Sequence, residues 1–289
     1  MTSTPPPHPA PVPPLRWFVT GASGGLGREL VRTALDAGDR VVATARRPEA
    51  LRDLLDAHPD RLTVVPLDLT VPDEISETLT RALAAGRIDV VVNNAGYSIV
   101  GATEEMTDAQ VEHQLAILLR APIQVTRAVL TPMREQGGGR IIQISSVGGQ
   151  ITTPASSAYH AGKWGLEGFT EALAKEVAEF GIYPTIVEPG GMRTNFAANI
   201  QTTAPLPAYE RGAVGTFRAF ITSAGPEVFT GDPRKLARAI FDTTREPRPP
   251  LRLTLGGDAY DMISKALHDR LDVLATQREL ARSVAFTGS

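Results

Sequence analysis

Short apolar runs alternate with longer segments of helical periodicity along most of the chain. The runs are rich in valine, isoleucine and leucine, which is typical of buried strands. We expect strands at Arg16–Thr20, Arg40–Ala45, Leu62–Leu67, Ile88–Val92, Arg140–Ser145, Ile182–Val187 and Leu251–Leu255. The segments between them repeat apolar residues every three to four positions, which predicts helices. We expect helices at Glu29–Ala37, Pro72–Ala85, two segments within Thr107–Gln136 (the second Pro122–Met133), Trp164–Phe180, Asp232–Thr243 and Tyr260–Thr276.

This alternation predicts an α/β fold with one domain over residues 15–289. Strands and helices that follow one another in turn favour a doubly wound, Rossmann-type parallel sheet, here of about seven strands, with helices on both faces. The segment 196–230 is mixed, with glycines and prolines and no strong period. We expect a mobile substrate lid near residues 192–230, because such loops often close over a bound substrate.

The N-terminus differs in composition from the rest. Its first fourteen residues hold seven prolines, without the charged and apolar regions of a signal peptide. Proline lacks a backbone donor and favours extended, solvated chain, so we expect a disordered tail over residues 1–14. A passive tail and a proline-rich docking peptide are both compatible with this composition.

Composition and charge restrict the class of protein. The chain has 289 residues, 42% of them apolar, a net charge of −3 and no cysteine. The apolar content is enough for a sizeable core. The lack of cysteine excludes disulfides and thiolate metal sites. The negative net charge means that nucleic acid is not expected as a partner. No apolar run approaches the roughly 20 residues that cross a bilayer. We expect a cytoplasmic protein that does not bind membranes. The five histidines lie scattered, without ligand spacing, and no metal site is expected.

A glycine-rich turn joins the first strand to the first helix. Gly21, Gly25 and Gly27 lie in the stretch TGASGGLG directly after the apolar run. Glycine lets the backbone approach a pyrophosphate closely, and a helix N-terminus offers it free N–H groups. The strand–turn–helix context therefore predicts a dinucleotide site.

The end of the second strand indicates which dinucleotide binds. Many such sites carry an acidic residue there that binds the adenosine ribose, but this chain has Ala45 followed by Arg46 and Arg47. A guanidinium suits a 2′-phosphate. We therefore infer NADP(H), with Arg46 as the principal contact. Alternatively, both arginines are solvated charges at the start of the next helix.

Candidate catalytic residues lie around the fifth strand. Ser146 follows its end, and Tyr159 and Lys163 lie four residues apart, which places them on one face if the segment from Ala158 is helical. An ammonium beside a phenol should lower the pKa of the tyrosine and prepare it for proton transfer. A surface pair is the alternative, since YxxxK alone recurs by chance.

Together these motifs resemble the short-chain dehydrogenase/reductase family in its NADP(H)-preferring type. The matching motifs are TGxxxGxG, NNAG, Ser…YxxxK and the Pro-Gly motif after the sixth strand, in family order over residues 15 to about 275. The resemblance implies that Ser146 binds the substrate oxygen, that Tyr159 exchanges the proton, and that Lys163 holds the nicotinamide ribose. It implies the following cofactor-binding set: Gly21, Ser23, Gly25, Leu26, Gly27, Arg46, Asp68, Leu69, Asn94, Ala95, Gly96, Tyr159, Lys163, Pro189, Gly190, Met192 and Thr194.

Several of these positions also have a structural interpretation. Asp68, which matches the family's adenine contact, is also suited to a helix cap. We expect Asn94 to contact the cofactor and Asn93 to brace the sheet. His160, about 100° round the helix from the tyrosine, is expected to be structural or to support the catalytic residues from behind. Trp164 is compatible with either an interface or the core.

One position departs from the family pattern. Leu118 stands where the family's catalytic tetrad has an asparagine that, with the lysine, positions a proton-relaying water. Leucine cannot form a side-chain hydrogen bond.

We predict an oxidoreductase that transfers a hydride between NADP(H) and a carbonyl or secondary alcohol of a small, non-polar substrate, in a homodimer or homotetramer. Leu118 leaves two alternatives open: a non-redox isomerase or cyclase, and a nucleotide sensor.

Overall fold

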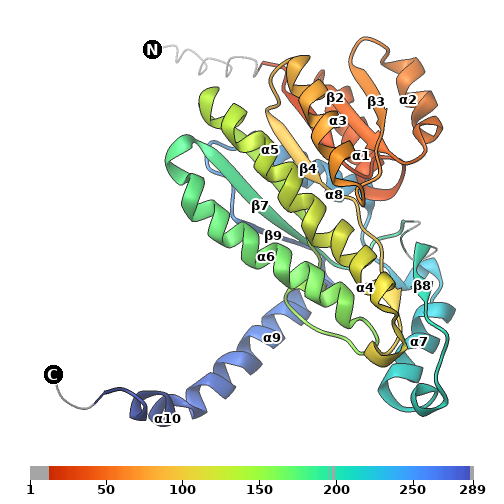
Figure 1. The fold of residues 1–289 in the computed structure, drawn as a ribbon, viewed down its shortest axis with the longest axis vertical. Coiled ribbons are helices and arrows are strands. Elements are labelled where there is room, and N and C mark those ends of the chain that lie inside the picture. The colour runs from red at the N-terminus through yellow and green to blue at the C-terminus, as the bar shows by residue number, and fades with distance from the viewer. Residues whose placement is uncertain (1–12, 195, 197–198, 287–289) are drawn as a thin grey trace, which may run out of the picture.

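A computed structural model describes residues 13–194, 196 and 199–286 (Figure 1). The first twelve residues of the expected proline-rich tail lie outside this description. Within the described ranges, no helix is both long and apolar enough to cross a membrane.

The core of the fold is one sheet of seven parallel strands, as predicted. Its strands are β1 (Arg16–Val19), β2 (Arg40–Ala45), β3 (Leu62–Pro66), β4 (Val90–Asn93), β6 (Gly139–Ile144), β7 (Ile182–Pro189) and β9 (Arg252–Leu255). They lie in the order β3-β2-β1-β4-β6-β7-β9. The order reverses between β1 and β4, and ligands of such sheets bind at the carboxyl ends of the strands beside that reversal.

Helices cover both faces of the sheet (Figure 1). The two faces belong to separate clusters of buried residues. On one face lie α1 (Gly25–Asp36) and α8 (Pro233–Thr244); on the other lie α3 (Pro72–Ala84), α5 (Ala121–Glu135) and α6 (Ser157–Val177). The short α2 (Arg52–Ala57) precedes β3, and α4 (Asp108–Leu115) continues through a π-helical turn, Ala116–Arg120, into α5.

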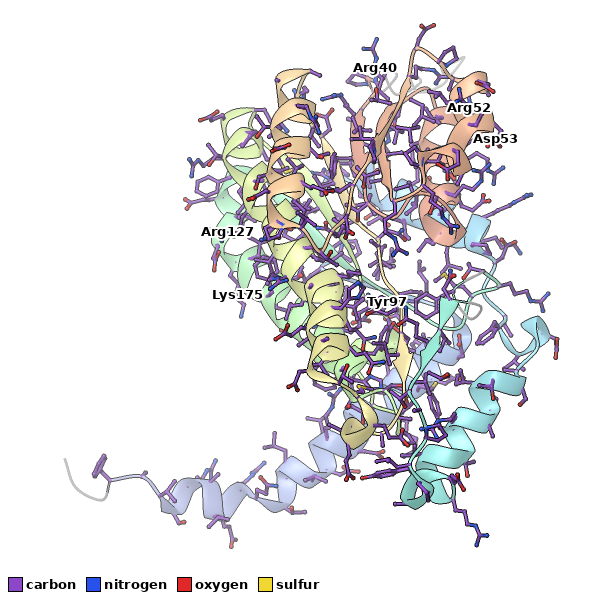
Figure 2. All side chains as sticks on the ribbon, turned by 45° about the vertical axis from the view of Figure 1, so that its right-hand side comes forward. Arg40, Arg52, Asp53, Tyr97, Arg127 and Lys175 are labelled. Atoms are coloured by element: carbon purple, nitrogen blue, oxygen red, sulfur yellow. The ribbon has the colours of Figure 1, made fainter. Side chains whose placement is uncertain are left out.

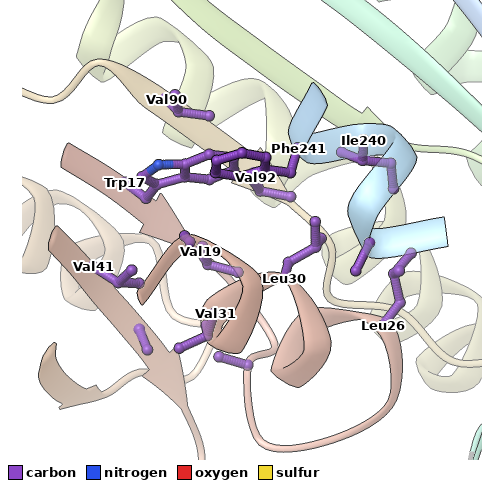
Figure 3. Packing of buried hydrophobic residues seen from close by; sticks show 14 of the residues in the cluster. Trp17, Val19, Leu26, Leu30, Val31, Val41, Val90, Val92, Ile240 and Phe241 are labelled. Atoms are coloured by element: carbon purple, nitrogen blue, oxygen red, sulfur yellow. The ribbon is translucent and has the colours of Figure 1, made fainter. Parts of the chain in front are cut away.

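The strand β1 joins the two clusters because its side chains alternate between the faces. Phe18 enters the α3–α5–α6 side and Trp17 the α1–α8 side. Trp17 stacks on Phe241 of α8 (Figure 3), with ring centroids 5.7 Å apart. Its indole N–H donates to Asp39 at 2.7 Å. Asp39 is almost fully buried and also binds Arg245. These contacts fix the sheet against the helix that follows the expected lid.

The expected lid segment contains regular structure. Its strand β8 (Gln201–Thr202) pairs with β5 (Ile99–Val100), and a helix that the sequence did not predict, α7 (Gly212–Ser223), follows. Glu105 holds the segment, accepting from the Leu206 N–H at 2.9 Å and pairing with Arg218 of α7. The chain ends in α9 (Gly257–Thr276) and α10 (Arg278–Ser283).

Candidate active site

The glycine-rich turn packs closely against the loop that follows β4. A Cβ on Gly21 would lie 2.7 Å from the Ala95 Cα, and one on Gly27 would collide with the Asn94 side chain and come within 2.5 Å of the Gly21 carbonyl oxygen. Gly21 and Gly25 also have φ values of +65° and +53°, which favour glycine. The turn therefore has no room for a side chain at Gly21 or Gly27. The helix α1 begins within it at Gly25.

Thr20 and Asn94 fasten this turn to the sheet. The Thr20 hydroxyl accepts from the Asn94 backbone N–H at 3.0 Å, and the Asn94 amide donates to the carbonyls of Thr20 and Gly21, both at 3.0 Å. The neighbouring Asn93 is buried and donates to the Thr126 hydroxyl on α5 at 3.3 Å. The expectation that Asn93 braces the sheet is confirmed. A cofactor contact of Asn94 stays a prediction.

Ser146, Tyr159 and Lys163 come together beyond the end of β6. Ser146 starts a short 3₁₀ turn, its hydroxyl accepting from the Gly148 N–H at 3.0 Å, and Tyr159 and Lys163 share one face of α6. The Lys163 Nζ lies 5.8 Å from the centroid of the Tyr159 ring. A Cβ on Gly96 would lie 3.8 Å from that Nζ. The loop 94–96 therefore binds the glycine turn and lies beside the lysine.

The expected lowering of the Tyr159 pKa is not found. Burial raises the pKa of Tyr159, and the Ser146 hydroxyl opposes this effect only in part. The Lys163 ammonium donates instead to the Ile144 carbonyl oxygen at 2.7 Å. Burial lowers the pKa of Lys163 to about 8, against the opposing effect of Glu167. The desolvation of the phenol therefore outweighs the hydrogen bond with Ser146, and the phenol keeps its proton at neutral pH.

Leu118 lies against the lysine end of the site. It is buried in the π-helical turn, and its side chain would meet a Cβ on Gly96 at 3.2 Å and one on Gly162 at 2.9 Å. The wall beside Lys163 is therefore apolar.

A buried acidic cluster lies one helical turn beyond Lys163. The carboxylate of Glu167 accepts from the Ser145 hydroxyl and from Arg252, both at 2.6 Å, and binds Gln150. Arg252 also donates to Glu188 at 2.6 Å. Burial raises the pKa of Glu167, whereas the bonds from Ser145 and Arg252 lower it. This cluster was not predicted, because a glutamate on a helix is usually solvated.

His160 has a structural role, as expected. Its Nδ1 lies 2.8 Å from the Gly148 carbonyl oxygen, and its Nε2 accepts from the Thr153 N–H at 2.8 Å. The ring is buried and fixes the loop between Ser146 and α6.

The predicted adenosine side lies at the ends of β2 and β3. Arg46 and Arg47 are exposed, and the short 3₁₀ turn that follows starts at Pro48, so Arg46 is not part of a helix. Asp68 accepts from the Thr70 N–H at 2.9 Å and hydroxyl at 2.7 Å, which lowers its pKa, with a smaller contribution from Arg46. Asp68 is not the cap of α3, which is Val71.

The segment after β7 lies against the glycine turn. Gly190 donates to the Leu255 carbonyl at 2.9 Å, and Gly191 donates to Asp258 at 2.8 Å. The Thr194 side chain would contact a Cβ on Gly25 at 3.3 Å, so the Pro-Gly motif and the glycine turn meet. Of the other predicted positions, Pro189 ends β7, Met192 and Leu69 pack on the core, Leu26 is buried in it, and Ser23 is exposed.

Two aromatic residues outside the predicted catalytic and cofactor-binding sets lie beside the site. Phe196 meets the Tyr159 ring edge to face at 6.4 Å between centroids. Tyr97, whose hydroxyl lies 2.6 Å from His113 Nδ1 of α4, lies in the middle of the molecule (Figure 2). Tyr97 directly follows the NNAG motif, the one signal that could have identified it.

Comparisons with known proteins agree with this arrangement. A profile of the short chain dehydrogenase family matches residues 16–205. The oxidoreductase BOA17 of Botryotinia fuckeliana is 38% identical over 276 residues, which cover 94% of this chain and 98% of that protein. The 3-ketodihydrosphingosine reductase of Bacteroides thetaiotaomicron is 31% identical over 241 residues, which cover 83% of this chain and 87% of that protein.

Solved structures show the same likeness. A short-chain dehydrogenase from Streptomyces avermitilis matches with a TM-score of 0.87 and 42% identity, covering 94% of this chain and 98% of that one. The closed form of a serine dehydrogenase complexed with NADP⁺ matches with a TM-score of 0.71 and 26% identity, covering 83% of this chain and 94% of that one.

Proposed function

The chain belongs to the short-chain dehydrogenase family and is an oxidoreductase; we propose that it transfers a hydride between NADP(H) and the carbonyl or secondary alcohol of a small, non-polar substrate. One observation carries the proposal. The loop 94–96 is hydrogen-bonded to the glycine-rich turn at one end and lies beside Lys163 at the other, so a dinucleotide in the turn would extend toward Ser146 and Tyr159.

The residues of the turn fit a dinucleotide. Side chains on Gly21 or Gly27 would fill the space beside Asn94 and Ala95, and the turn runs directly into the N-terminus of α1. The first N–H groups of a helix have no intrahelical partner and favour a phosphate. We assign the pyrophosphate to Gly21–Gly27 and the nicotinamide end to Pro189–Thr194.

The charge at the end of β2 supports NADP(H) over NAD(H). Arg46 follows the buried Ala45, and its positive charge acts to lower the pKa of both Asp68 and Tyr97, so it lies close enough to act on these two residues. A guanidinium attracts a 2′-phosphate, which a carboxylate at the same place would repel. The NADP⁺ complex of the serine dehydrogenase, at 26% identity, gives further support.

The protein groups supply the proton chemistry. When bound, the reduced cofactor would supply the hydride. The Tyr159 phenol, whose raised pKa keeps it protonated, would donate a proton to the substrate oxygen, and the Ser146 hydroxyl would hold that oxygen in place. Lys163 would bind the nicotinamide ribose and keep a positive charge next to the developing alkoxide. Leu118 and Phe196 make the surroundings of these groups apolar, which supports a non-polar substrate.

The experiment is a screen of ketones and secondary alcohols for the change in absorbance of the reduced nicotinamide. We expect NADPH to be oxidised in proportion to the ketone consumed. The name of the 3-ketodihydrosphingosine reductase denotes reduction of a keto group and makes keto compounds the first choice. An isomerase, a cyclase or a sensor would bind NADP(H) without this stoichiometric oxidation, and that result would overturn the proposal.

A further inference from the structure

One face of α6 carries a third ionisable side chain in line with the two that the proposed reaction uses. Tyr159, Lys163 and Glu167 follow one another four residues apart, so they lie on the same face of the helix. The Glu167 side chain is only 4% exposed. Burying a carboxylate is costly unless it is paired and hydrogen-bonded. The contacts of Glu167 therefore indicate what its burial holds in place.

The carboxylate of Glu167 binds both ends of the serine loop, by which we mean residues 145–150. One of its oxygens accepts from the Ser145 hydroxyl at 2.6 Å. The other accepts from the side-chain amide of Gln150. Ser145 directly precedes Ser146, and Gln150 directly follows the short 3₁₀ turn that Ser146 starts. A single side chain of α6 thus fixes the loop on both sides of the serine.

The turn within the serine loop packs directly on this carboxylate. A Cβ on Gly149 would collide with the carboxylate of Glu167 and lie 2.5 Å from the Ser145 Oγ. The turn is closed by bonds to Ser146, whose hydroxyl accepts from the Gly148 N–H at 3.0 Å and whose carbonyl accepts from the Gly149 N–H at 2.8 Å. A shift at either end of the loop would therefore change where the Ser146 hydroxyl points.

The carboxylate is in turn anchored to the sheet. Arg252 of β9 donates to Glu167 and to Glu188 of β7, both at 2.6 Å. The Thr254 hydroxyl, also on β9, donates to Glu188 at 2.7 Å. Two carboxylates this close repel each other unless a cation lies between them, and Arg252 supplies that cation. Gln150 also donates to Glu188, at a longer 3.2 Å. Glu167 is therefore held by two strands while it holds the serine loop.

The position of the Ser146 hydroxyl matters because the proposed reaction requires it to hold the substrate oxygen. A misplacement of about 1 Å in such a group can cost about 10²-fold in rate. We propose that Glu167 is a positioning residue for Ser146: it holds Ser145 and Gln150 and thereby directs the Ser146 hydroxyl at the substrate oxygen. The inference rests on the proposed function, but the geometry of the loop can be measured without turnover.

Ser145→Ala combined with Gln150→Met tests the inference. This double variant removes both bonds from the loop to the carboxylate but leaves Glu167 paired with Arg252, so the buried cluster keeps its cation. With a ketone that the wild-type protein reduces, kcat at pH 7 should fall by about 10-fold to 100-fold, whereas NADPH affinity should stay within about twofold. Thr152→Ala, exposed just beyond the loop, is the control and should keep the wild-type kcat. A double variant with the wild-type kcat would overturn the inference.

A second set of variants separates positioning from a general structural role. Ser146→Ala lacks the hydroxyl that is to be positioned, so adding Ser145→Ala and Gln150→Met to it should lower kcat no further. If the two losses multiply instead, the bonds of the loop act independently of Ser146 and the inference is wrong. The thermal midpoint Tm of each variant shows whether it is folded at the temperature of the assay.

Amide hydrogen exchange measures the loop without a substrate. The N–H groups of Gly148 and Gly149, both bonded to Ser146, should exchange about tenfold faster or more in the double variant, because each lost side-chain bond helps to hold the turn closed. In Thr152→Ala they should exchange at the wild-type rate. Unchanged exchange in the double variant would contradict the inference whatever the activity. A wild-type protein that oxidises no NADPH with any ketone would count against the proposed function, and exchange would then decide the inference alone.

Discussion

The Lys163 ammonium donates a 2.7 Å hydrogen bond to the carbonyl oxygen of Ile144, the last residue of β6. The lysine is therefore tied to the sheet, while Tyr159, one helical turn before it, is approached by the Ser146 hydroxyl. The charge of this buried lysine depends on pH within the range in which enzymes are assayed, since burial lowers its pKa to about 8.

The first prediction concerns the pH dependence of carbonyl reduction. Lys163 carries its charge below a pH of about 8 and loses it above. Because that charge lies next to the developing alkoxide, kcat/KM for ketone reduction should fall as the pH rises through this value. A profile that stays level through this range would show that the charge of Lys163 is not needed.

The second prediction concerns Glu167, whose negative charge opposes the lowering of the Lys163 pKa. Glu167→Gln keeps the shape of the side chain but removes the charge, so the alkaline fall in kcat/KM should move to lower pH. Glu171→Gln is the control, because Glu171 also binds Arg252 but is half exposed. If the pH profiles of kcat/KM are the same for both variants, Glu167 has only a structural role. The thermal midpoint Tm of each variant shows whether its folding has changed.

The third prediction compares two glycines of the same turn. A Cβ on Gly27 would collide with Asn94 and the Gly21 carbonyl, whereas a Cβ on Gly24 would meet nothing within 4 Å. Gly27→Ala should therefore weaken NADPH binding by about tenfold or more and lower Tm, since over-packing a closed site costs about 1–3 kcal/mol. Gly24→Ala should leave Tm unchanged, because its Cβ would meet no protein atom. Fluorescence titration of NADPH measures the binding, and a Gly27→Ala protein that binds NADPH as tightly as the wild type would contradict the assignment of the pyrophosphate to this turn.

The fourth prediction concerns the choice of cofactor. Arg46→Ala removes the guanidinium proposed to bind the 2′-phosphate, so NADPH should bind more weakly by about 10-fold to 100-fold, given 1.5–3 kcal/mol for a hydrogen bond to a charged group. NADH, which lacks the phosphate, should bind as before. Arg52→Ala, exposed on α2 (Figure 2), is the control and should leave both affinities unchanged. An equal loss for NADPH and NADH would refute the preference.

Much of the fold could be predicted from the sequence because its strands are buried on both faces. Val90, Val91 and Val92 form a continuous apolar run, which is typical of a parallel strand. The helix α7 could not be predicted, because Gly212 and Gly215 weaken its local preference. Its Arg218 pairs with Glu105, more than a hundred residues earlier in the chain, and such contacts have no local signal.

The sequence was enough to predict which side chains meet beyond the end of β6, but not the pKa shifts of these side chains. Ser146, Tyr159 and Lys163 meet as their spacing implies, because the first lies at the end of a strand and the others share one face of a helix. The direction of the Tyr159 pKa was wrong because sequence reasoning weighed the neighbouring charge without the burial that opposes it. The cluster around Glu167 depends on Arg252, which only the folded sheet brings to it.

The proton transfer by Tyr159 is the central claim, and Tyr159→Phe tests it most directly. The variant keeps the ring but loses the proton, so the rate of NADPH oxidation with a ketone that the wild-type protein reduces should fall by about 10²–10⁴-fold. NADPH affinity, measured by titration in the same samples, should stay within about twofold, because the phenol contributes to chemistry more than to binding. A Tyr159→Phe protein that oxidises NADPH at the wild-type rate would contradict the account.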